Sequence, residues 1–299
     1  MKIFTKPLLA LLMLGLTLGL VVPTYAATSP NLGMASSFAV LAGTAVTNVP
    51  TSNIRWDVGL SPAAGSNIAG LTAAQVGGTI YAADATGPGG SAVNPGLLTI
   101  AKTDLANAYD GLAGGANANA NCLAGYTFGT GNKDLVGLNL VPGVYCADSF
   151  TLTGTLTLSG SGVWVFRSAS TLVTSGTANI VGGDPCNVWW QVPSSATLGT
   201  NTSFIGNILA LTNISVATGA TLNGRALARN AAVTLDHNTI TNALCATANT
   251  TGSSPTVVPT LPNTGVYTAK ANSPWNLIIL IGLLTASLVF VASQRKKKL

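Results

Sequence analysis

The sequence predicts a mainly β protein, an irregular β-solenoid of roughly triangular section with one long α-helix beside it. Three observations predict this fold class. Short runs rich in Val, Ile, Thr and Phe follow one another without a sustained helical period. Apolar positions recur at a nearly constant interval over the last part of this region. One segment, 95–114, instead has apolar residues at helical spacing.

The predicted strands are short runs separated by Gly, Asn, Ser or Thr. Between residues 151 and 242 they include Thr151–Leu158, Val163–Arg167, Asn187–Val192, Ala196–Leu198, Ser203–Ala210, Ile214–Val216, Thr221–Ala228 and Val233–Leu235. Two more strand-like runs, Phe38–Leu41 and Thr44–Thr47, lie near the N-terminal end. Trp189 and Trp190 alternate within one strand, so one is expected in the core and the other at a rim.

Several of these strands share one period. Three columns of apolar residues have the same interval between successive members: Leu198, Val216 and Leu235; Phe204, Leu222 and Ile240; and Leu209 and Leu227. Three columns with a common period indicate three short strands per coil, each coil stacked on the last. Val163 and Val188 are further apart than this interval, so the coils vary in length. A β-sandwich is the alternative, but it would show longer strands and hairpin turns.

The segment from Pro95 to Gly114 is predicted to be an amphipathic helix. Asn94-Pro95 is a suitable start, and Gly114-Gly115 a suitable end. A single helix of this kind in a β protein is expected to lie along one face of the solenoid and cover its apolar side chains.

Residues 1–26 have the three parts of a secretory signal. Lys2 and Lys6 supply positive charge, an apolar stretch spans residues 8–22, and Thr24-Tyr25-Ala26 is a small-x-small cleavage site. The exported chain would then begin at Ala27. An N-terminal membrane anchor is the alternative interpretation.

The C-terminal end has three parts in a fixed order. They are Leu261, Pro262, Asn263, Thr264 and Gly265, then an uncharged and mostly apolar run at 275–292, then a basic tail at 295–299. The apolar run is long enough to cross a membrane, and the basic tail would stay in the cytoplasm. The arrangement resembles the cell-wall sorting signal of Gram-positive surface proteins. That resemblance implies that a sortase cleaves after Thr264 and joins its carboxyl group to peptidoglycan, which would place the protein on the outside of the cell wall.

These ends define the expected organisation of the chain. Residues 27–246 would form the solenoid domain, and residues 247–260, rich in Thr, Ser and Pro, would form a stalk. The ends also account for the formal charge of +5. Seven of the 13 basic residues lie in them, so residues 27–264 keep six basic residues and eight Asp, a net charge of −2.

The composition excludes several function classes. The six remaining basic residues are scattered, so the clustered charge of a nucleic-acid interface is missing. The chain has no Glu and a single His, and Asp236-His237 is the one acid–His neighbour pair. Paired acids or an activated nucleophile are therefore not expected, and His237 is interpreted as a solvated turn residue. We expect neither an enzyme nor a metal or cofactor site.

The four cysteines, Cys122, Cys146, Cys186 and Cys245, predict two disulfides in an exported chain. Three pairings are possible, and we favour Cys122–Cys146 with Cys186–Cys245. A metal site is the alternative, but the chain lacks a close Cys-x-x-Cys pair.

Several stretches occur together in the order found in one known family. They are Asn31-Leu32-Gly33 with 37–43, Asp57-Val58-Gly59-Leu60-Ser61-Pro62, Leu140-Val141-Pro142-Gly143-Val144-Tyr145, and 186–192 continuing through 206–210 and 222–228 to 233–235. They resemble the bacterial and fungal ice-binding proteins with a discontinuous β-solenoid. The resemblance implies a right-handed triangular solenoid that an N-terminal coil closes out of sequence order. It also implies a monomer that adsorbs to an ice crystal through one flat face, without catalysis or a cofactor.

Alternation within the strands predicts the residues of that face. Thr197, Ser215 and Thr234 each stand between inward-pointing neighbours and are expected to point outward. The family resemblance adds Thr47 and Thr151 to this column, and Val173 would interrupt it. A second column is expected on the next face: Asn179, Ser203, Thr221 and Thr239.

An uncharged face with hydroxyls about 4.7 Å apart can order a water layer that merges with ice, because this strand spacing is close to repeats of the ice lattice. Outward Thr and Ser are also common on any wet β-face. The alternative function is therefore a wall-anchored adhesin that binds a glycan or another surface without ice activity.

Overall fold

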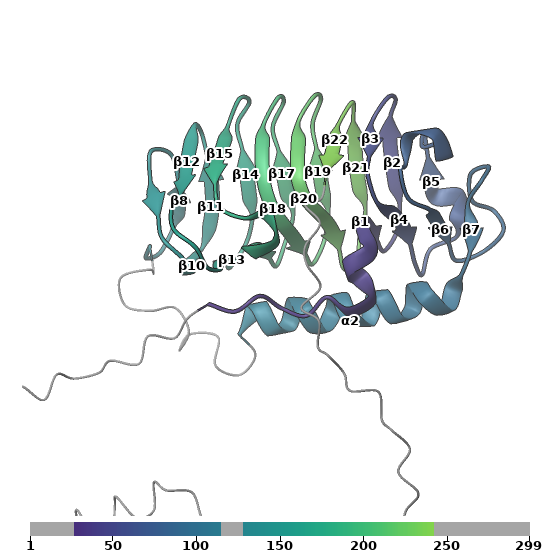
Figure 1. The fold of residues 1–299 in the computed structure, drawn as a ribbon, viewed down its shortest axis with the longest axis horizontal. Helices are drawn as coiled ribbons and strands as arrows, with labels where there is room; N and C mark the ends of the chain where they lie inside the picture. The colour runs from purple at the N-terminus through teal and green to yellow at the C-terminus, as the bar shows by residue number, and fades with distance from the viewer. Residues whose placement is uncertain (1–26, 115–127, 242–299) are drawn as a thin grey trace, which may run out of the picture. The chain divides into compact units, whose positions relative to one another are not determined.

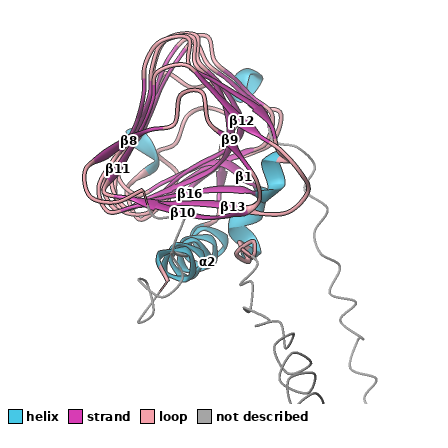
Figure 2. Cartoon of the chain, turned by 90° about the vertical axis from the view of Figure 1, so that its left-hand side faces the viewer, coloured by secondary structure: helices cyan, strands magenta, loops and turns pink. Residues whose placement is uncertain are grey.

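The structure, a computed structural model, describes residues 27–114 and 128–241. The chain divides into two compact units, Met1–Thr247 and Ala248–Leu299, and all described residues belong to the first. This unit consists mainly of short parallel strands stacked side by side, with the helix α2 (Pro95–Ala113) running along them (Figure 1). Viewed end-on, the strands outline a triangle, and α2 lies outside one of its sides (Figure 2). The predicted mainly β fold with a helix alongside is therefore confirmed.

The strands form three faces, which we number 1 to 3. Face 1 contains β10 (Gly143–Ala147), β13 (Trp164–Ser168), β16 (Val188–Val192), β1 (Phe38–Ala42), β4 (Asp57–Leu60), β6 (Ile80–Ala82) and β7 (Ala92–Val93). Face 2 is a separate eight-stranded sheet of β8 (Asn132–Asp134), β11 (Ser149–Leu152), β14 (Leu172–Thr174), β17 (Ala196–Leu198), β19 (Ile214–Val216), β21 (Val233–Asp236), β2 (Val46–Val49) and β5 (Ile68–Ala69). Face 3 contains β9 (Asn139–Leu140), β12 (Thr155–Leu158), β15 (Asn179–Gly182), β22 (Thr239–Thr241) and β3 (Asn53–Ile54).

Two long strands, β18 (Ser203–Ala210) and β20 (Thr221–Ala228), each begin on face 3 and end on face 1. They turn this corner at Gly206 and Gly224, whose φ angles are 114° and 153°. A β-carbon on Gly224 would clash with the carbonyl oxygen of Gly206. Glycine is therefore needed here so that neighbouring coils can approach each other. Other connections within the described residues contain the 3₁₀ helices η1 (Gly33–Ser37), η2 (Gly65–Asn67), η3 (Ala73–Gln75) and η5 (Pro185–Asn187).

The coils do not stack in the order of the sequence. β1 lies between β20 and β4, so Val40 has Ala226 on one side and Val58 on the other. In the same way β2 lies between β21 and β5, and β3 pairs with β22. The N-terminal coil thus packs against the last described coil, in the middle of the stack. This agrees with the out-of-order closure that the family resemblance implied.

The interior of the solenoid holds one apolar cluster that runs through all the coils. Tyr145, Phe166 and Trp190 occupy matching positions in β10, β13 and β16, and their ring centroids are 5.3 and 3.9 Å apart. Phe204 extends this stack, 5.0 Å from Trp190. Burial of an apolar side chain the size of Phe166 contributes roughly 1.5–3 kcal/mol. Because the stack crosses coil boundaries, it holds successive coils in register.

A second apolar cluster joins α2 to the outer side of face 1. The helix begins after Asn94, whose side chain accepts a hydrogen bond from the Leu97 amide at 3.0 Å, and ends at Gly114, with φ 88°. Its buried side consists of Leu98, Ala101, Leu105, Ala108, Tyr109 and Leu112. Trp189 belongs to this cluster and is only 4% exposed. The expectation of a rim tryptophan is therefore wrong, because α2 covers the outward side of this strand.

The predicted strands match observed strands to within two residues at each end, with one exception, and β14, β15 and β22 were not among them. The predicted strand Thr151–Leu158 is in fact two strands, β11 and β12, separated at Thr153-Gly154. The chain turns there from face 2 to face 3, and the Thr and Leu residues continue on both sides of the corner.

Candidate functional site

The five residues predicted to form one outward column do so on face 2. Thr197 lies beside Ser215, Ser215 beside Thr234, and Thr234 beside Thr47. Thr151 is in the same column, separated from Thr197 by Val173. Ala69 continues the column after Thr47. We call these seven residues the face 2 column: Thr151, Val173, Thr197, Ser215, Thr234, Thr47 and Ala69.

The backbone of each strand determines that the column points outward. In β19, Ile214 and Val216 are buried, and Ser215 between them is partly exposed. β17 and β21 show the same alternation around Thr197 and Thr234. The Thr151 hydroxyl accepts a hydrogen bond from the Asn132 side chain at 3.1 Å. In the described part of the chain the hydroxyls of Thr197 and Ser215 have no protein partner, so they are available to water.

The face 2 column carries no charge from Thr151 to Ala69. All its members are Thr, Ser, Val or Ala, whose side chains are short and end in hydroxyl or methyl groups. A charged residue, Asp134, occurs at this position only in the end strand β8, beside Thr151. The column is therefore a narrow strip of hydroxyl and methyl groups.

The buried cations lie on the helix side of the solenoid instead. Lys102 of α2 donates from its ammonium group to the carbonyl oxygens of Ala228 and Arg229, at 2.9 and 2.5 Å. Burial, and secondarily the nearby charge of Arg229, lowers the pKa of Lys102 to about 8. Arg229 itself forms an ion pair with Asp110 of α2 at 2.7 Å.

Two further arginines hold the same side together. Arg225 donates to the Ser36 carbonyl at 2.9 Å and to Asn207 Oδ1 at 2.8 Å, and burial lowers its pKa to about 10. Arg167 donates to the Leu112 carbonyl at 2.7 Å, near the end of α2, and burial also lowers its pKa. These contacts attach the helix and the N-terminal segment to face 1, and they leave face 2 free of basic residues between Thr151 and Ala69.

The second predicted column is present on face 3. Register aligns six residues along it: Thr155, Asn179, Ser203, Thr221, Thr239 and Asn53. It differs from the face 2 column in size and chemistry, because Asn179 and Asn53 have longer amide side chains. An adjacent outward position holds Val181, which is 37% exposed, and Asn223. Face 3 is therefore less even than face 2.

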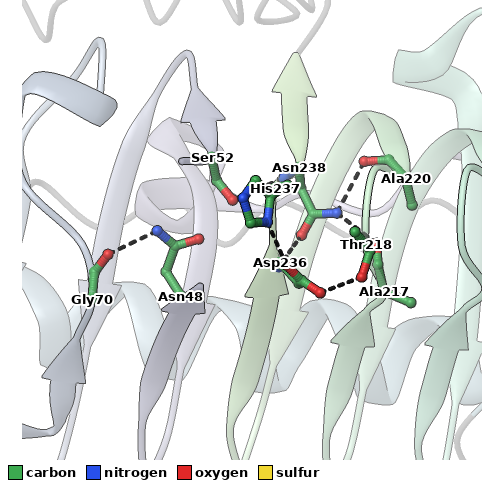
Figure 3. Close-up of polar contacts among 9 residues, drawn as sticks. All are labelled: Asn48, Ser52, Gly70, Ala217, Thr218, Ala220, Asp236, His237 and Asn238. Atoms are coloured by element: carbon green, nitrogen blue, oxygen red, sulfur yellow. Dashed lines mark hydrogen bonds and ion pairs between the residues drawn. The ribbon is translucent and has the colours of Figure 1, made fainter. Parts of the chain in front are cut away.

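Buried side chains fix the corner between faces 2 and 3 (Figure 3). Asn238 is 1% exposed, and its amide group donates to the carbonyls of Ala217 and Ala220 at 2.8 and 3.1 Å. Its backbone amide donates to the Ser52 hydroxyl at 2.9 Å. Asn238 thus links three neighbouring coils, including the N-terminal one. The sequence pattern does not single out Asn238 or Ser52, and the one signal for Asn238 is that it is a polar residue directly after a predicted turn.

Neighbouring residues extend these contacts. Asp236 accepts hydrogen bonds from Thr218 and from His237, and these lower its pKa. His237 has a left-handed backbone with φ 51° and an exposed ring, as expected of a turn residue. Asn48 donates to the Gly70 carbonyl at 2.8 Å (Figure 3). The corner beside the face 2 column is therefore held by hydrogen bonds from coil to coil.

Several predicted features lie outside the described residues. They are Cys122, Cys245, the sorting motif 261–265, the apolar run 275–292 and both chain ends. Cys146 and Cys186 lie within the described residues, and each is in a disulfide. No helix of the described part is long and apolar enough to cross a membrane. The same part contains no group of three His, Cys or Asp residues placed to hold a metal ion.

Comparison with known proteins identifies the family to which the chain belongs. A family model described as Ice-binding-like matches residues 40–241, which is more than half of the chain. The chain belongs to the ice-binding-like family. The matched residues contain the five predicted residues of the face 2 column and the corner formed by Asn238.

Relatives in the ice-binding-like family align with most of this chain. An ice-binding protein of Nostoc sp. (strain HG1) is 42% identical over 231 residues, 73% of this chain and 76% of the relative. An ice-binding protein of Flavobacterium frigoris (strain PS1) is 39% identical over 217 residues, 71% and 75% of the two chains. Among solved structures, an ice-binding protein from an Antarctic biological consortium is 36% identical with a TM-score of 0.62, covering 73% of this chain and 93% of that one.

Proposed function

We propose that the chain is a wall-displayed protein that adsorbs to ice through the face 2 column. The observation that carries this proposal is the register of Thr151, Thr197, Ser215, Thr234 and Thr47 on the outer side of one sheet, in a column without a charged residue between Thr151 and Ala69. Membership of the ice-binding-like family and the names of the relatives support the choice of ice as the ligand.

The proposed mechanism needs no chemistry on the ligand. Successive hydroxyls are separated by the distance between strands, about 4.7–4.9 Å. Methyl groups of Thr and Val between them bind water weakly, so water over the column can adopt an ice-like arrangement. A charged side chain would hold its own hydration shell and disturb this layer. Each contact is weak, but a rigid surface loses little entropy on binding, so many contacts add to firm adsorption by a monomer.

Face 2 is the better candidate of the two hydroxyl-bearing faces. The amide groups of Asn179 and Asn53 on face 3 bind water through several hydrogen bonds and project further than Thr or Ser. Val181 also projects from that face. The face 2 column has none of these interruptions between Thr151 and Ala69, apart from the apolar Val173.

The proposal also includes the handedness of the solenoid and the attachment of the chain to the cell wall, both predicted from the sequence. The coils wind in a right-handed sense, as parallel strand connections generally do. The chain is exported, cleaved by a sortase after Thr264 and joined to peptidoglycan there. Replacement of Thr264 by Ala should release the protein from the cell wall into the medium or leave it in the membrane. Wall attachment unchanged by this substitution would overturn the sortase assignment.

The test of ice binding uses the chain from Ala27 to Thr264 with its disulfides formed. Thermal hysteresis and inhibition of ice recrystallisation are measured over a concentration series. We expect both activities. Their absence at high micromolar concentration would favour the other candidate, a wall-anchored adhesin that binds a glycan or another surface.

A further inference from the structure

One turn of the solenoid is longer than the matching turns beside it. The turn from β20 to β21, residues 229–232, has four residues, whereas the turns from β16 to β17, from β18 to β19 and from β1 to β2 each have three. An extra residue shifts the register of the following strand by one unless the turn absorbs it, and such a shift would point Thr234 inward. Thr234 nevertheless lies in register with Ser215 and Thr47, so turn 229–232 absorbs the extra residue.

The side chain of Asn213 bonds the end of this turn. Ala232 is the last residue before β21, and its carbonyl oxygen accepts a hydrogen bond from the Ile214 amide at 3.0 Å, as in a regular parallel ladder. The amide of Ala232, however, donates to Asn213 Oδ1 at 3.1 Å, so a side-chain oxygen takes the place of a backbone carbonyl. The backbone carbonyl of Asn213 accepts from the Ala196 amide at 2.9 Å. Asn213 therefore bonds the coils on both sides of its own.

Other contacts hold the rest of the turn. The carbonyl of Ala231 accepts from the Gly43 amide of the N-terminal coil at 2.8 Å. The carbonyl of Arg229 accepts from the Lys102 ammonium group at 2.5 Å, and its guanidinium group forms an ion pair with α2. These contacts fix the part of the turn next to face 1 and the N-terminal coil. The bond from Asn213 fixes the end that leads into face 2.

We infer that Asn213 is a positioning residue of the proposed ice-binding surface: its side-chain oxygen fixes the longer turn so that β21 enters face 2 with Thr234 in register with Ser215 and Thr47. The effect on ice binding rests on the proposed function, whereas the bond between Asn213 and Ala232 does not. Without this bond the amide of Ala232 loses its acceptor, so the start of β21 is held less firmly. Thr234 and Thr47 then lose their fixed spacing, and a less rigid surface binds more weakly.

Asn230 provides a matched control within the same turn. Like Asn213 it is an exposed asparagine, but in the described part of the chain its side chain has no hydrogen bond. Asn213→Ala removes the acceptor of the Ala232 amide, Asn230→Ala removes an amide that bonds nothing, and Asn213→Asp keeps an oxygen acceptor.

Hydrogen exchange of the Ala232 amide is measured by NMR in the disulfide-bonded chain from Ala27 to Thr264. We expect exchange to be about tenfold faster in Asn213→Ala and unchanged in Asn230→Ala and Asn213→Asp. Unchanged exchange in Asn213→Ala, or equally fast exchange in Asn213→Asp, would overturn the inference, whether or not the protein binds ice.

The effect on ice binding is tested against a variant that is destabilised elsewhere. Asn94→Ala removes the N-terminal cap of α2, which lies outside face 1 (Figure 2). We expect thermal hysteresis to fall several-fold in Asn213→Ala and to stay unchanged in Asn230→Ala and in the less stable Asn94→Ala. An equal fall in Asn213→Ala and Asn94→Ala, or no fall in Asn213→Ala, would overturn the positioning role. Absence of thermal hysteresis in the unsubstituted chain would count against the proposed function instead, and hydrogen exchange would still test the contact.

Discussion

The side-chain hydroxyl of Thr47 lies 3.2 Å from that of Thr234, although the two residues are 187 positions apart in the chain. The contact exists because the N-terminal coil packs against the last described coil. Thr47 and Ala69 thereby lengthen the face 2 column beyond the point where the sequence order breaks. The N-terminal coil closes the stack and also enlarges the proposed ice-binding surface.

Val173 is the gap in the hydroxyl run of this column and is 40% exposed. Val173→Thr keeps the shape of the side chain and adds a hydroxyl between Thr151 and Thr197. We expect higher thermal hysteresis, with the free energy of unfolding changed by no more than about 0.5 kcal/mol. The matched control is Val181→Thr, at a similarly exposed position on face 3, which should leave activity unchanged. The same increase in both variants would contradict the choice of face.

Asn238→Ala removes the amide that bonds the carbonyls of Ala217 and Ala220. Two buried acceptors then lose their donor, so we expect the free energy of unfolding in urea to fall by about 1–3 kcal/mol. Thermal hysteresis should fall as well, because the corner beside the face 2 column is no longer held. Thr239→Ala, at the next position and exposed, is the control for a general effect of this turn. Equal stability of Asn238→Ala and Thr239→Ala would contradict the structural role of the corner.

Lys102 should make stability depend on pH. Its pKa is about 8 in the folded chain and about 10.5 when exposed, so between these values the unfolded chain binds more protons and stability rises with pH. From about pH 7 to pH 9.5 we expect the free energy of unfolding to increase by about 2 kcal/mol from this residue. Burial raises the pKa of Tyr109, so at higher pH this residue makes stability fall as pH rises. The measurement therefore stops at about pH 9.5.

Lys102→Met should abolish most of this increase, measured by urea unfolding at the two pH values. The methionine, at the same position of α2, still fills the space between the helix and the solenoid, so the helix remains docked. A variant with the same rise in stability as the original chain would show that Lys102 is not the group responsible.

Much of the proposed site could be predicted from the sequence. Thr197, Ser215 and Thr234 stand between apolar neighbours in short strands, and local alternation was enough to place them outward. Thr47 and Thr151 could be added only through the family resemblance, because their places depend on which coils are adjacent. The break between β11 and β12 was missed because Thr and Leu alternate without interruption through the corner.

The residues that hold the coils together could not be predicted. Asn238 and Ser52 are 186 positions apart, and their contact depends on the out-of-order packing of the N-terminal coil. Trp189 faces out of the solenoid, and its burial depends on α2, which comes much earlier in the chain. Local patterns give the direction of a side chain within its strand, but not what covers it.

The most direct test compares two tyrosine substitutions in the same coil. Thr234 and Thr239 are both exposed, the first in the face 2 column and the second on face 3. Thermal hysteresis is measured for Thr234→Tyr and Thr239→Tyr at equal concentration, with equal urea unfolding as the check on folding. We predict that Thr234→Tyr loses most of the activity and Thr239→Tyr keeps it. Full activity in Thr234→Tyr, or loss only in Thr239→Tyr, would contradict ice binding through face 2.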